Sequence, residues 1–240
     1  MIGALPMWQR ALKRSVDIGI AFFGLLLLAP LLLGIALLVL LGSGIPILHR
    51  EKRIGQFGRP FTLLKFRTLK RGSTTDNSVI AEDDSRITLV GRPLRRSRLD
   101  ELTQLFNVLR GDMSLVGPRP MVERHLNALD RAVCEALLSV RPGVTDPASI
   151  LYFAEAAVLA ERPDAEAEYV NVLLPAKVRV QLNYLWHWTP LLDIRIIFQT
   201  LARLWSQKAR EVSMQRVRAV LATEDESGRH RDPAPPPRQP

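Results

Sequence analysis

Cysteine is nearly missing from this 240-residue chain, in which Cys134 is the single example. An internal disulfide framework is therefore excluded, and the composition is typical of a reducing compartment. The four histidines (His49, His125, His187 and His230) lie far apart without the spacing of metal ligands, and the chain has no glycine-rich phosphate loop and no internal repeat. Each histidine is interpreted as a structural or surface residue.

Acidic residues are the minority of the charged residues: 24 Asp and Glu face 33 Lys and Arg, which gives a formal charge of +9. Such an excess predicts an anionic partner, whether nucleic acid, an acidic membrane surface or a phosphorylated substrate. Apolar residues make up 47% of the chain, too many for a disordered protein. The length and composition predict one globular domain, or one domain with an anchor.

One segment lacks charge altogether: the 24 residues from Ile18 to Leu41 contain no Asp, Glu, Lys or Arg. As a continuous helix it would rise about 36 Å, enough to cross the hydrocarbon core of a bilayer. A cleavable signal peptide fits poorly, because the run is too long and the strongly basic stretch 49–71 follows it. Pro30 lies at the middle of the run, where proline removes a backbone hydrogen bond and bends a helix.

Positive charge on both sides of this segment bears on its topology. Arg10, Lys13 and Arg14 precede it, and the stretch 49–71 carries eight Lys and Arg against one Glu, a net charge of +7. An ordinary span would place one basic cluster outside, whereas basic residues tend to stay cytoplasmic. We therefore predict a re-entrant helix-break-helix with its break at Pro30, and favour it over an ordinary span.

The rest of the chain predicts short elements, most of them helical. The stretch 61–69 is rich in β-branched and aromatic residues and predicts a strand, and the polar stretch 72–86 predicts a loop. Apolar residues at helical spacing predict helices over 99–109, 126–137 and 190–204. The predicted fold is mainly α with minor β: an N-terminal re-entrant membrane hairpin followed by a small cytosolic domain with interfacial amphipathic helices.

Tryptophans gather around the last of these helices, because Trp186, Trp188 and Trp205 lie in or beside it. Tryptophan favours the membrane interface, which predicts an interfacial helix; a helix buried in the protein core explains the apolar stripe equally well. The proline-rich residues after Leu221 predict a disordered tail without a catalytic role. The predicted divisions are 1–48 (N-terminal segment and membrane hairpin), 49–210 (cytosolic or interfacial domain) and 211–240 (C-terminal extension ending in the tail).

Residues that could carry chemistry concentrate between 94 and 120. The adjacent carboxylates Asp100 and Glu101 follow a cluster of arginines, and Arg119 lies between two prolines. One interpretation is structural: Ser97 with Asp100 three residues later resembles a capping box, and carboxylates in a first turn complement the helix dipole. The other is functional, because arginines at a helix start bind anions and paired carboxylates bind a divalent cation. The arginines are Arg92, Arg95, Arg96 and Arg98.

Several motifs occur together in an order that resembles one known family. The order resembles that of the bacterial sugar transferase family, the monotopic phosphoglycosyl transferases that begin glycoconjugate assembly on a polyprenyl phosphate. The similarity covers about residues 10–205 and is strongest over 94–120. The motifs are Lys13-Arg14-Ser15-Val16-Asp17, the apolar hairpin with its central proline, Lys65-Phe66-Arg67-Thr68, Leu99-Asp100-Glu101-Leu102, the stretch 107–120 and Arg141-Pro142-Gly143-Val144-Thr145.

The resemblance implies transfer of a sugar 1-phosphate from a UDP-sugar to undecaprenyl phosphate with release of UMP, the first membrane step of exopolysaccharide, O-antigen, capsule or glycoprotein assembly. It implies that Asp100 is the nucleophile of a covalent aspartyl-phosphosugar intermediate and that Glu101 is its partner at Mg²⁺. A carboxylate that attacks phosphorus would split a transfer between two anions into two easier steps. The residues implied in binding phosphate or nucleotide are Lys65, Arg67, Arg95, Arg119 and Arg141.

The resemblance also implies a place for the enzyme: the bacterial cytoplasmic (inner) membrane, with the catalytic domain on the cytosolic face. Undecaprenyl phosphate, a UDP-sugar and anionic membrane lipids are the expected partners, and a homodimer is left open. The chain departs from the family pattern at Thr103, where many relatives have proline, and over 146–149 after Thr145. Because of the departure over 146–149, the sequence does not identify the sugar of the UDP-sugar donor.

Two alternatives belong to other classes of protein. A nucleic-acid binder would explain the basic charge, but it predicts a recognition helix rich in Lys and Arg, whereas these cations flank the membrane segment and the carboxylate pair; no nucleic-acid partner is expected. A membrane-tethered basic binding or scaffold protein without catalysis would need neither Asp100 nor Glu101.

Overall fold

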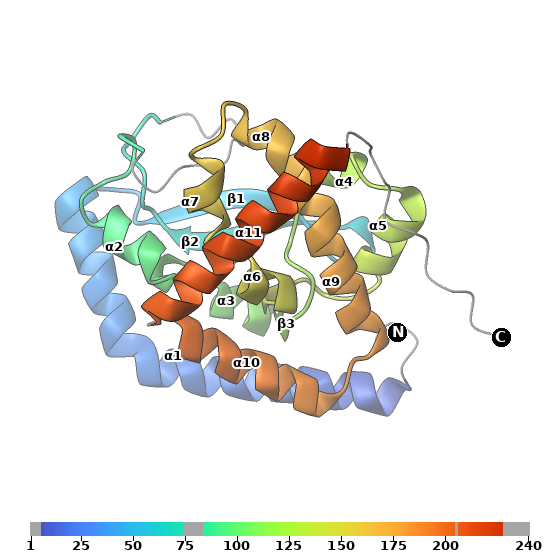
Figure 1. Cartoon of the computed structure of the whole chain (residues 1–240). Coiled ribbons are helices and arrows are strands. Elements are labelled where there is room, and N and C mark those ends of the chain that lie inside the picture. The colour runs from blue at the N-terminus through green and yellow to red at the C-terminus, as the bar shows by residue number, and fades with distance from the viewer. Residues whose placement is uncertain (1–5, 74–83, 205, 228–240) are drawn as a thin grey trace.

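The computed structural model describes residues 6–73, 84–204 and 206–227, which form a mainly helical chain with two small sheets. Figure 1 shows helix α1 along the base of the molecule with most other elements packed above it. The predicted class, mainly α with minor β, is confirmed. The elements are α1 (Met7–Ser43), β1 (Leu48–Ile54), η2 (Gln56–Gly58), β2 (Pro60–Phe66), α2 (Gly91–Arg96), η3 (Leu99–Glu101), α3 (Gln104–Arg110), β3 (Ser114–Val116), α4 (Glu123–Asn127), α5 (Arg131–Leu138), β4 (Gly143–Thr145), α6 (Pro147–Leu151), α7 (Glu155–Leu159), α8 (Ala165–Glu168), η4 (Tyr169–Leu173), α9 (Leu174–Trp186), α10 (Pro190–Leu204) and α11 (Gln207–Ser227).

Helix α1 is long and apolar enough to cross a membrane, and no other helix in the described ranges is. Its helical conformation continues through Pro30, and Figure 1 shows that the helix is bent. The predicted break is therefore a bend within one helix and not an interruption. Large apolar side chains along α1 are exposed, among them Phe23, Leu27 and Leu33. Such a surface is costly in water and is typical of a segment in contact with lipid.

Both halves of α1 are bonded to or packed on the rest of the chain. In the first half, the buried Asp17 carboxylate accepts hydrogen bonds from the Ser114 hydroxyl at 2.7 Å and the Leu115 backbone N–H at 3.1 Å. In the second half, Ile35 and Val39 pack in one buried cluster with side chains of β2 and α2. The predicted boundary at residue 48 therefore does not separate two independently packed bodies.

The two sheets are small and differ in type. Strands β1 and β2 pair antiparallel, with His49 opposite Lys65, and β3 pairs parallel with β4. The strand predicted over 61–69 is confirmed as β2. Strand β1 was not predicted, because its charged residues Arg50 to Arg53 form an unbroken run without the alternation of apolar and polar residues that is typical of a strand with one polar face.

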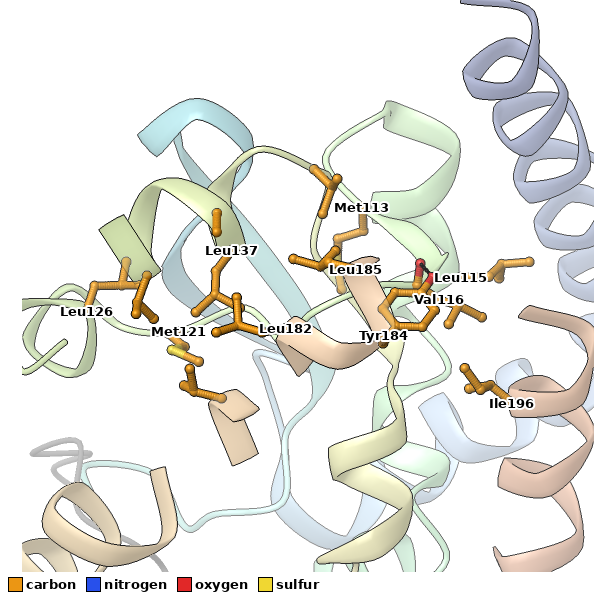
Figure 2. Packing of buried hydrophobic residues seen from close by; sticks show 14 of the residues in the cluster. Met113, Leu115, Val116, Met121, Leu126, Leu137, Leu182, Tyr184, Leu185 and Ile196 are labelled. Carbon is orange, nitrogen blue, oxygen red and sulfur yellow. Dashed lines mark hydrogen bonds between the residues drawn. The ribbon is translucent and has the colours of Figure 1, made fainter. Parts of the chain in front are cut away.

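The main hydrophobic core lies between β3, α5, α9 and α10, as Figure 2 shows. Met113, Val116 and Leu185 are buried in it, and the Tyr184 hydroxyl donates to Asp193 Oδ1 at 2.7 Å at the start of α10. This core holds β3, which leads directly into the Pro118–Pro120 segment. It therefore fixes the segment that carries Arg119.

Two predicted helices have different boundaries in the structure. The helix predicted over 99–109 begins only at Gln104, after the 3-10 turn η3, and ends at Gly111, whose φ of 92° is the left-handed conformation that glycine adopts readily. The helix predicted over 126–137 is divided between α4 and α5. The helix predicted over 190–204 is confirmed as α10.

The face of α10 does not pack wholly into the core. Ile196 is buried, whereas Leu191, Ile194, Phe198 and Leu201 are exposed. Figure 1 shows α10 lying beside α1, and the ion pair of Lys13 Nζ with Asp193 Oδ2, at 2.5 Å, joins the two helices. The alternative of a fully buried helix is therefore wrong.

The C-terminal helix α11 packs on the domain through Val217 and Leu221, which are fully buried. The predicted boundary at residue 210 falls inside this helix, and residues 222–227 of the predicted disordered tail are helical. The remainder of that tail, 228–240, and residues 74–83 of the predicted loop lie outside the described residues.

Candidate active site

The carboxylate pair lies in a short turn and not in the first turn of an α-helix. Helix α2 ends at Ser97, whose hydroxyl donates to the Pro93 carbonyl at 2.7 Å, and Arg98 has a φ of 57°. Because a non-glycine residue in the left-handed region reverses the chain locally, η3 turns away from α2. The capping box is not formed, so the structural interpretation of Asp100 loses its main support.

Asp100 and Glu101 line a polar cleft of about 280 Å³. Its residues come from β1, β2, α2, η3 and the segments around 119–125, 153–156 and 210, so distant parts of the sequence build one site. Cations outnumber carboxylates, which makes the cleft suitable for a highly anionic ligand. The charged residues and histidines of the cleft are His49, Glu51, Arg53, Lys65, Arg67, Arg95, Arg96, Arg98, Asp100, Glu101, Arg119, His125, Glu155 and Arg210.

Glu101 is held by three cations. Its Oε1 lies 2.7 Å from Arg119 Nη2, 3.3 Å from Arg98 Nη1 and 3.7 Å from Lys65 Nζ. Although burial opposes ionisation, these positive charges hold the pKa of Glu101 well below its usual range. The same contact raises the pKa of Arg119, so both groups remain charged. Glu101 is therefore a fixed anion that orders the cations around it.

Asp100 has the opposite environment. It is 7% exposed, and its Oδ1 is buried without a hydrogen-bond partner among the described residues. Burial, and next the negative charge of Glu101, raise the pKa of Asp100 to about 6. Lys65, Arg98 and Arg95 oppose that rise. Two adjacent carboxylates thus have pKa values shifted in opposite directions, an arrangement that assigns them different chemical roles.

The structure brings together four of the five predicted substrate-binding residues, but not in equal roles. Lys65, Arg95 and Arg119 line the cleft beside the carboxylates. Arg67 also lines it, yet its guanidinium donates to the backbone carbonyls of Ser43, Gly44 and Ile45 and so closes the C-terminal end of α1. Its main contacts are with the backbone and leave little of the guanidinium for a substrate.

Arg141 is the predicted site residue that the structure does not bring to the cleft. Its Nε donates to the Gly111 carbonyl at 2.8 Å, and the side chain is absent from the described lining. The motif that begins at Arg141 has a packing role in this chain, because the Arg141 bond ties the loop before β4 to the end of α3. The prediction that Arg141 binds substrate is therefore not supported by its position.

Sequence reasoning missed a buried residue that positions Arg119. Asp146 is fully buried, and its Oδ2 accepts hydrogen bonds from the Arg119 backbone N–H at 2.9 Å and from Gln181 Nε2 at 2.8 Å. Its Oδ1 accepts from the Ser149 N–H and caps α6. The pattern Asp-Pro-Ala-Ser is a recognisable helix start, which could have revealed the cap but not the bond to Arg119.

Two histidines that were interpreted as structural or surface residues also line the cleft. His49 lies on β1 with Glu51 and Arg53 at alternate positions, a period of two that places all three on one face of the strand. Burial lowers the pKa of His49, so it is largely neutral at neutral pH. His125 lies within 2.9 Å of Glu166. No local signal identifies His49, because the intervening positions Arg50 and Lys52 are charged as well.

The chain thus combines a long apolar N-terminal helix with a cationic cleft in which two adjacent carboxylates have pKa values shifted in opposite directions. Residues 8–207 match the family model described as "Bacterial sugar transferase", and the chain belongs to the bacterial sugar transferase family. The chain is 36% identical over 208 residues to the UDP-glucose:undecaprenyl-phosphate glucose-1-phosphate transferase of Escherichia coli (strain K12), a match that covers 84% of this chain and 42% of the relative.

Other relatives carry related names. The UDP-N-acetylgalactosamine-undecaprenyl-phosphate N-acetylgalactosaminephosphotransferase of Aeromonas hydrophila is 34% identical over 193 residues, which are 79% of this chain and 43% of the relative. The exopolysaccharide production protein ExoY of Sinorhizobium fredii is 36% identical over 205 residues, which are 79% of this chain and 83% of the relative. The chain thus spans about two fifths of the first two relatives and most of the third.

Proposed function

We propose that this chain is a membrane-anchored phosphoglycosyl transferase that moves a sugar 1-phosphate from a UDP-sugar to undecaprenyl phosphate and releases UMP. The observation that carries the proposal is the pair of adjacent carboxylates with opposite environments in one cationic cleft. The printed names of the relatives describe the same class of reaction with different sugars, and one describes exopolysaccharide production.

In the first step Asp100 attacks the phosphorus that carries the sugar. A bond forms between a carboxylate oxygen and that phosphorus, the bond to the UMP oxygen breaks, and UMP leaves with the electron pair. A group with a pKa of about 6 is ionised at pH 7.5 and is still more basic than an ordinary carboxylate, so it is the better nucleophile.

In the second step a phosphate oxygen of undecaprenyl phosphate attacks the same phosphorus. The bond to Asp100 breaks, the carboxylate is restored, and undecaprenyl diphosphate-sugar leaves. Lys65, Arg95 and Arg119 offset the charge of the phosphates in both steps, since all three line the cleft. Glu101 holds Arg119 and Lys65 in place through its ion pairs.

The site fits a divalent cation. Asp100 and Glu101, the adjacent carboxylates of the cleft, would be the protein ligands of Mg²⁺; within the described ranges no three His, Cys, Asp or Glu side chains form a metal cluster. The unpartnered Oδ1 of Asp100 is the observation that favours a cation there. When bound, Mg²⁺ would offset negative charge on the diphosphate.

The apolar surfaces support a position at the cytosolic face of the inner membrane. We propose that α1 enters and leaves the bilayer on one face, with its bend inside the hydrocarbon, and that the exposed side chains of α10 lie in the interface. Leu191 and Phe198 of α10 are 77% and 67% exposed, which is costly for leucine and phenylalanine in water. Such a placement brings the cleft to the level of a lipid phosphate.

The test is UMP release by purified enzyme in detergent with a panel of UDP-sugars, undecaprenyl phosphate and Mg²⁺. Asp100→Asn should release no UMP above background, whereas the matched change Asp164→Asn, at the exposed cap of α8, should leave turnover unchanged. Radiolabel from the sugar phosphate should remain on the protein when the acceptor is omitted and should leave when it is added. Full turnover by Asp100→Asn would refute the covalent mechanism, and absence of UMP release with every UDP-sugar would refute the function.

A further inference from the structure

A second hollow lies next to the active site and has the opposite chemical character. Its volume is about 900 Å³, and apolar side chains form most of its wall. Leu32, Leu33 and Ala36 come from the second half of α1, Leu48 from β1 and Phe106 from α3. We call it the apolar groove. Leu33 is 72% exposed and Phe106 is 43% exposed, so the groove is open to the surroundings of α1.

The apolar groove is continuous with the polar cleft. His49, Phe66 and Arg67 line both hollows. His49 lies opposite Lys65 in the β1–β2 pair, and Lys65 Nζ lies 3.7 Å from Glu101 Oε1. One cross-strand pair therefore separates the end of the apolar groove from the carboxylates. A ligand that occupied both hollows would be an amphiphile with an anionic end and a long apolar end.

The proposed reaction supplies one substrate of that kind. The UDP-sugar is polar throughout, whereas the acceptor has a phosphate that must reach Asp100 and an isoprenoid chain that must stay out of water. A bilayer lipid with two acyl chains also has an anionic end, but it does not need to reach the carboxylates. The groove leads to the carboxylates and is walled by the helix with the longest apolar surface, which favours the acceptor.

We propose that the apolar groove holds the first isoprene units of the acceptor, with their phosphate directed past His49 into the cleft. The inference rests on the proposed function and goes beyond it by assigning the groove residues to recognition of the chain. The donor occupies the part of the cleft that the groove does not share, which Phe153, Glu155 and Arg210 help to line. The acceptor phosphate reaches Asp100 from the side of the groove after UMP has left the cleft.

The first experiment measures chain-length preference. Leu33→Trp fills the groove from an exposed position, and Leu41→Trp is the matched control, because Leu41 is 76% exposed on the same half of α1 and does not line the groove. The ratio of kcat/KM for undecaprenyl phosphate to kcat/KM for methyl phosphate, which has no isoprene unit to occupy the groove, is determined for each enzyme. We expect Leu33→Trp to lower that ratio about tenfold, because the burial of only a few methylene groups contributes enough binding free energy for a tenfold change in affinity.

The donor half-reaction distinguishes this inference from the proposed function. UMP release in the absence of acceptor should be equal in wild type, Leu33→Trp and Leu41→Trp, because the donor does not enter the groove. An unchanged ratio for Leu33→Trp in an enzyme that turns over normally would overturn the groove assignment alone. An equal fall in the ratio for Leu41→Trp would overturn it as well.

Photolabelling tests the occupant without any need for turnover. A polyprenyl phosphate with a diazirine on its second isoprene unit is irradiated with the full-length chain in nanodiscs. Labels on peptides containing residues 32–36 and 106 would support the assignment even if no UDP-sugar were transferred. Labels confined to other surfaces, or labels abolished by excess phosphatidylglycerol, would overturn it in favour of ordinary bilayer lipid.

Discussion

Replacing Asp100 with asparagine is expected to stop turnover and to stabilise the fold. The pKa of this carboxyl is raised from its ordinary value of 3.8 to about 6 by burial and by Glu101. At 1.36 kcal/mol for each tenfold change in proton affinity, the charged form costs the folded chain about 3 kcal/mol. Asparagine keeps the shape of the side chain and carries no charge, so it removes this cost.

The pH dependence gives the sign of the effect. The pKa of Asp100 in the folded chain lies above its value in the unfolded chain. The contribution of the protonated carboxyl to the free energy of unfolding is therefore fully present below a pH of about 4 and is lost as the pH rises through about 6. The gain from Asp100→Asn should therefore be about 3 kcal/mol at pH 7.5 and about 1 kcal/mol at pH 4.5. For a chain of this size, the larger figure corresponds to a Tm increase of about 6–12 °C.

Thermal unfolding in detergent micelles measures both values, in buffer with EDTA so that a bound cation cannot offset the charge. Glu101→Gln is the internal comparison: cations lower the pKa of Glu101, so its loss should destabilise the protein, and more at pH 7.5 than at pH 4.5. A Tm for Asp100→Asn at or below that of wild type at pH 7.5 would refute the reasoning, and so would a gain that does not depend on pH.

Four further outcomes are expected. Wild-type kcat/KM, measured as UMP release from pH 8 to 5, should fall as the pH decreases, because protonation removes the nucleophilic form of Asp100; a flat profile would contradict this. Arg119→Lys should lower kcat/KM about 10²-fold, since a lysine cannot reproduce the guanidinium contact with its carboxylate. Asp146→Asn should lower kcat about tenfold with little change in the donor KM, because it displaces Arg119 without removing a binding group. If only the Tm changed, the role of Asp146 would be purely structural. Arg141→Lys should lower the Tm by a few degrees, because it removes the bond to the Gly111 carbonyl, and should leave the donor KM unchanged.

Elements with a strong local pattern could be predicted from the sequence. Helix α1 follows from an uninterrupted apolar run, and α10 follows from Thr189-Pro190 with a regular apolar stripe. The carboxylate pair could be found because Asp100 and Glu101 are adjacent and follow a dense cluster of arginines. These features can be predicted without knowing which distant segments of the chain pack together.

Features that depend on tertiary contacts could not be predicted. Nothing local distinguishes Arg98, with its left-handed backbone, from its neighbours, yet that residue separates η3 from α2 and brings its guanidinium to Glu101. The motif assigned Arg141 to substrate, although its side chain contacts a backbone carbonyl, and no pattern pointed to Asp146 as the residue that holds Arg119. Such roles are set by which surfaces pack together, and sequence spacing does not contain that information.

The attachment of both halves of α1 to one body bears on how the protein is inserted. Lys13 and Arg14, near one end of the helix, bond to the backbone of β3 and α3, and the carbonyls at its other end accept from Arg67. Translocating a lysine or arginine through the centre of a bilayer costs about 2.5–3.5 kcal/mol per residue. A helix whose two ends bind the same folded body requires no such crossing, so we expect α1 to enter its membrane from one side without moving Lys13, Arg14 or Arg67 through the bilayer.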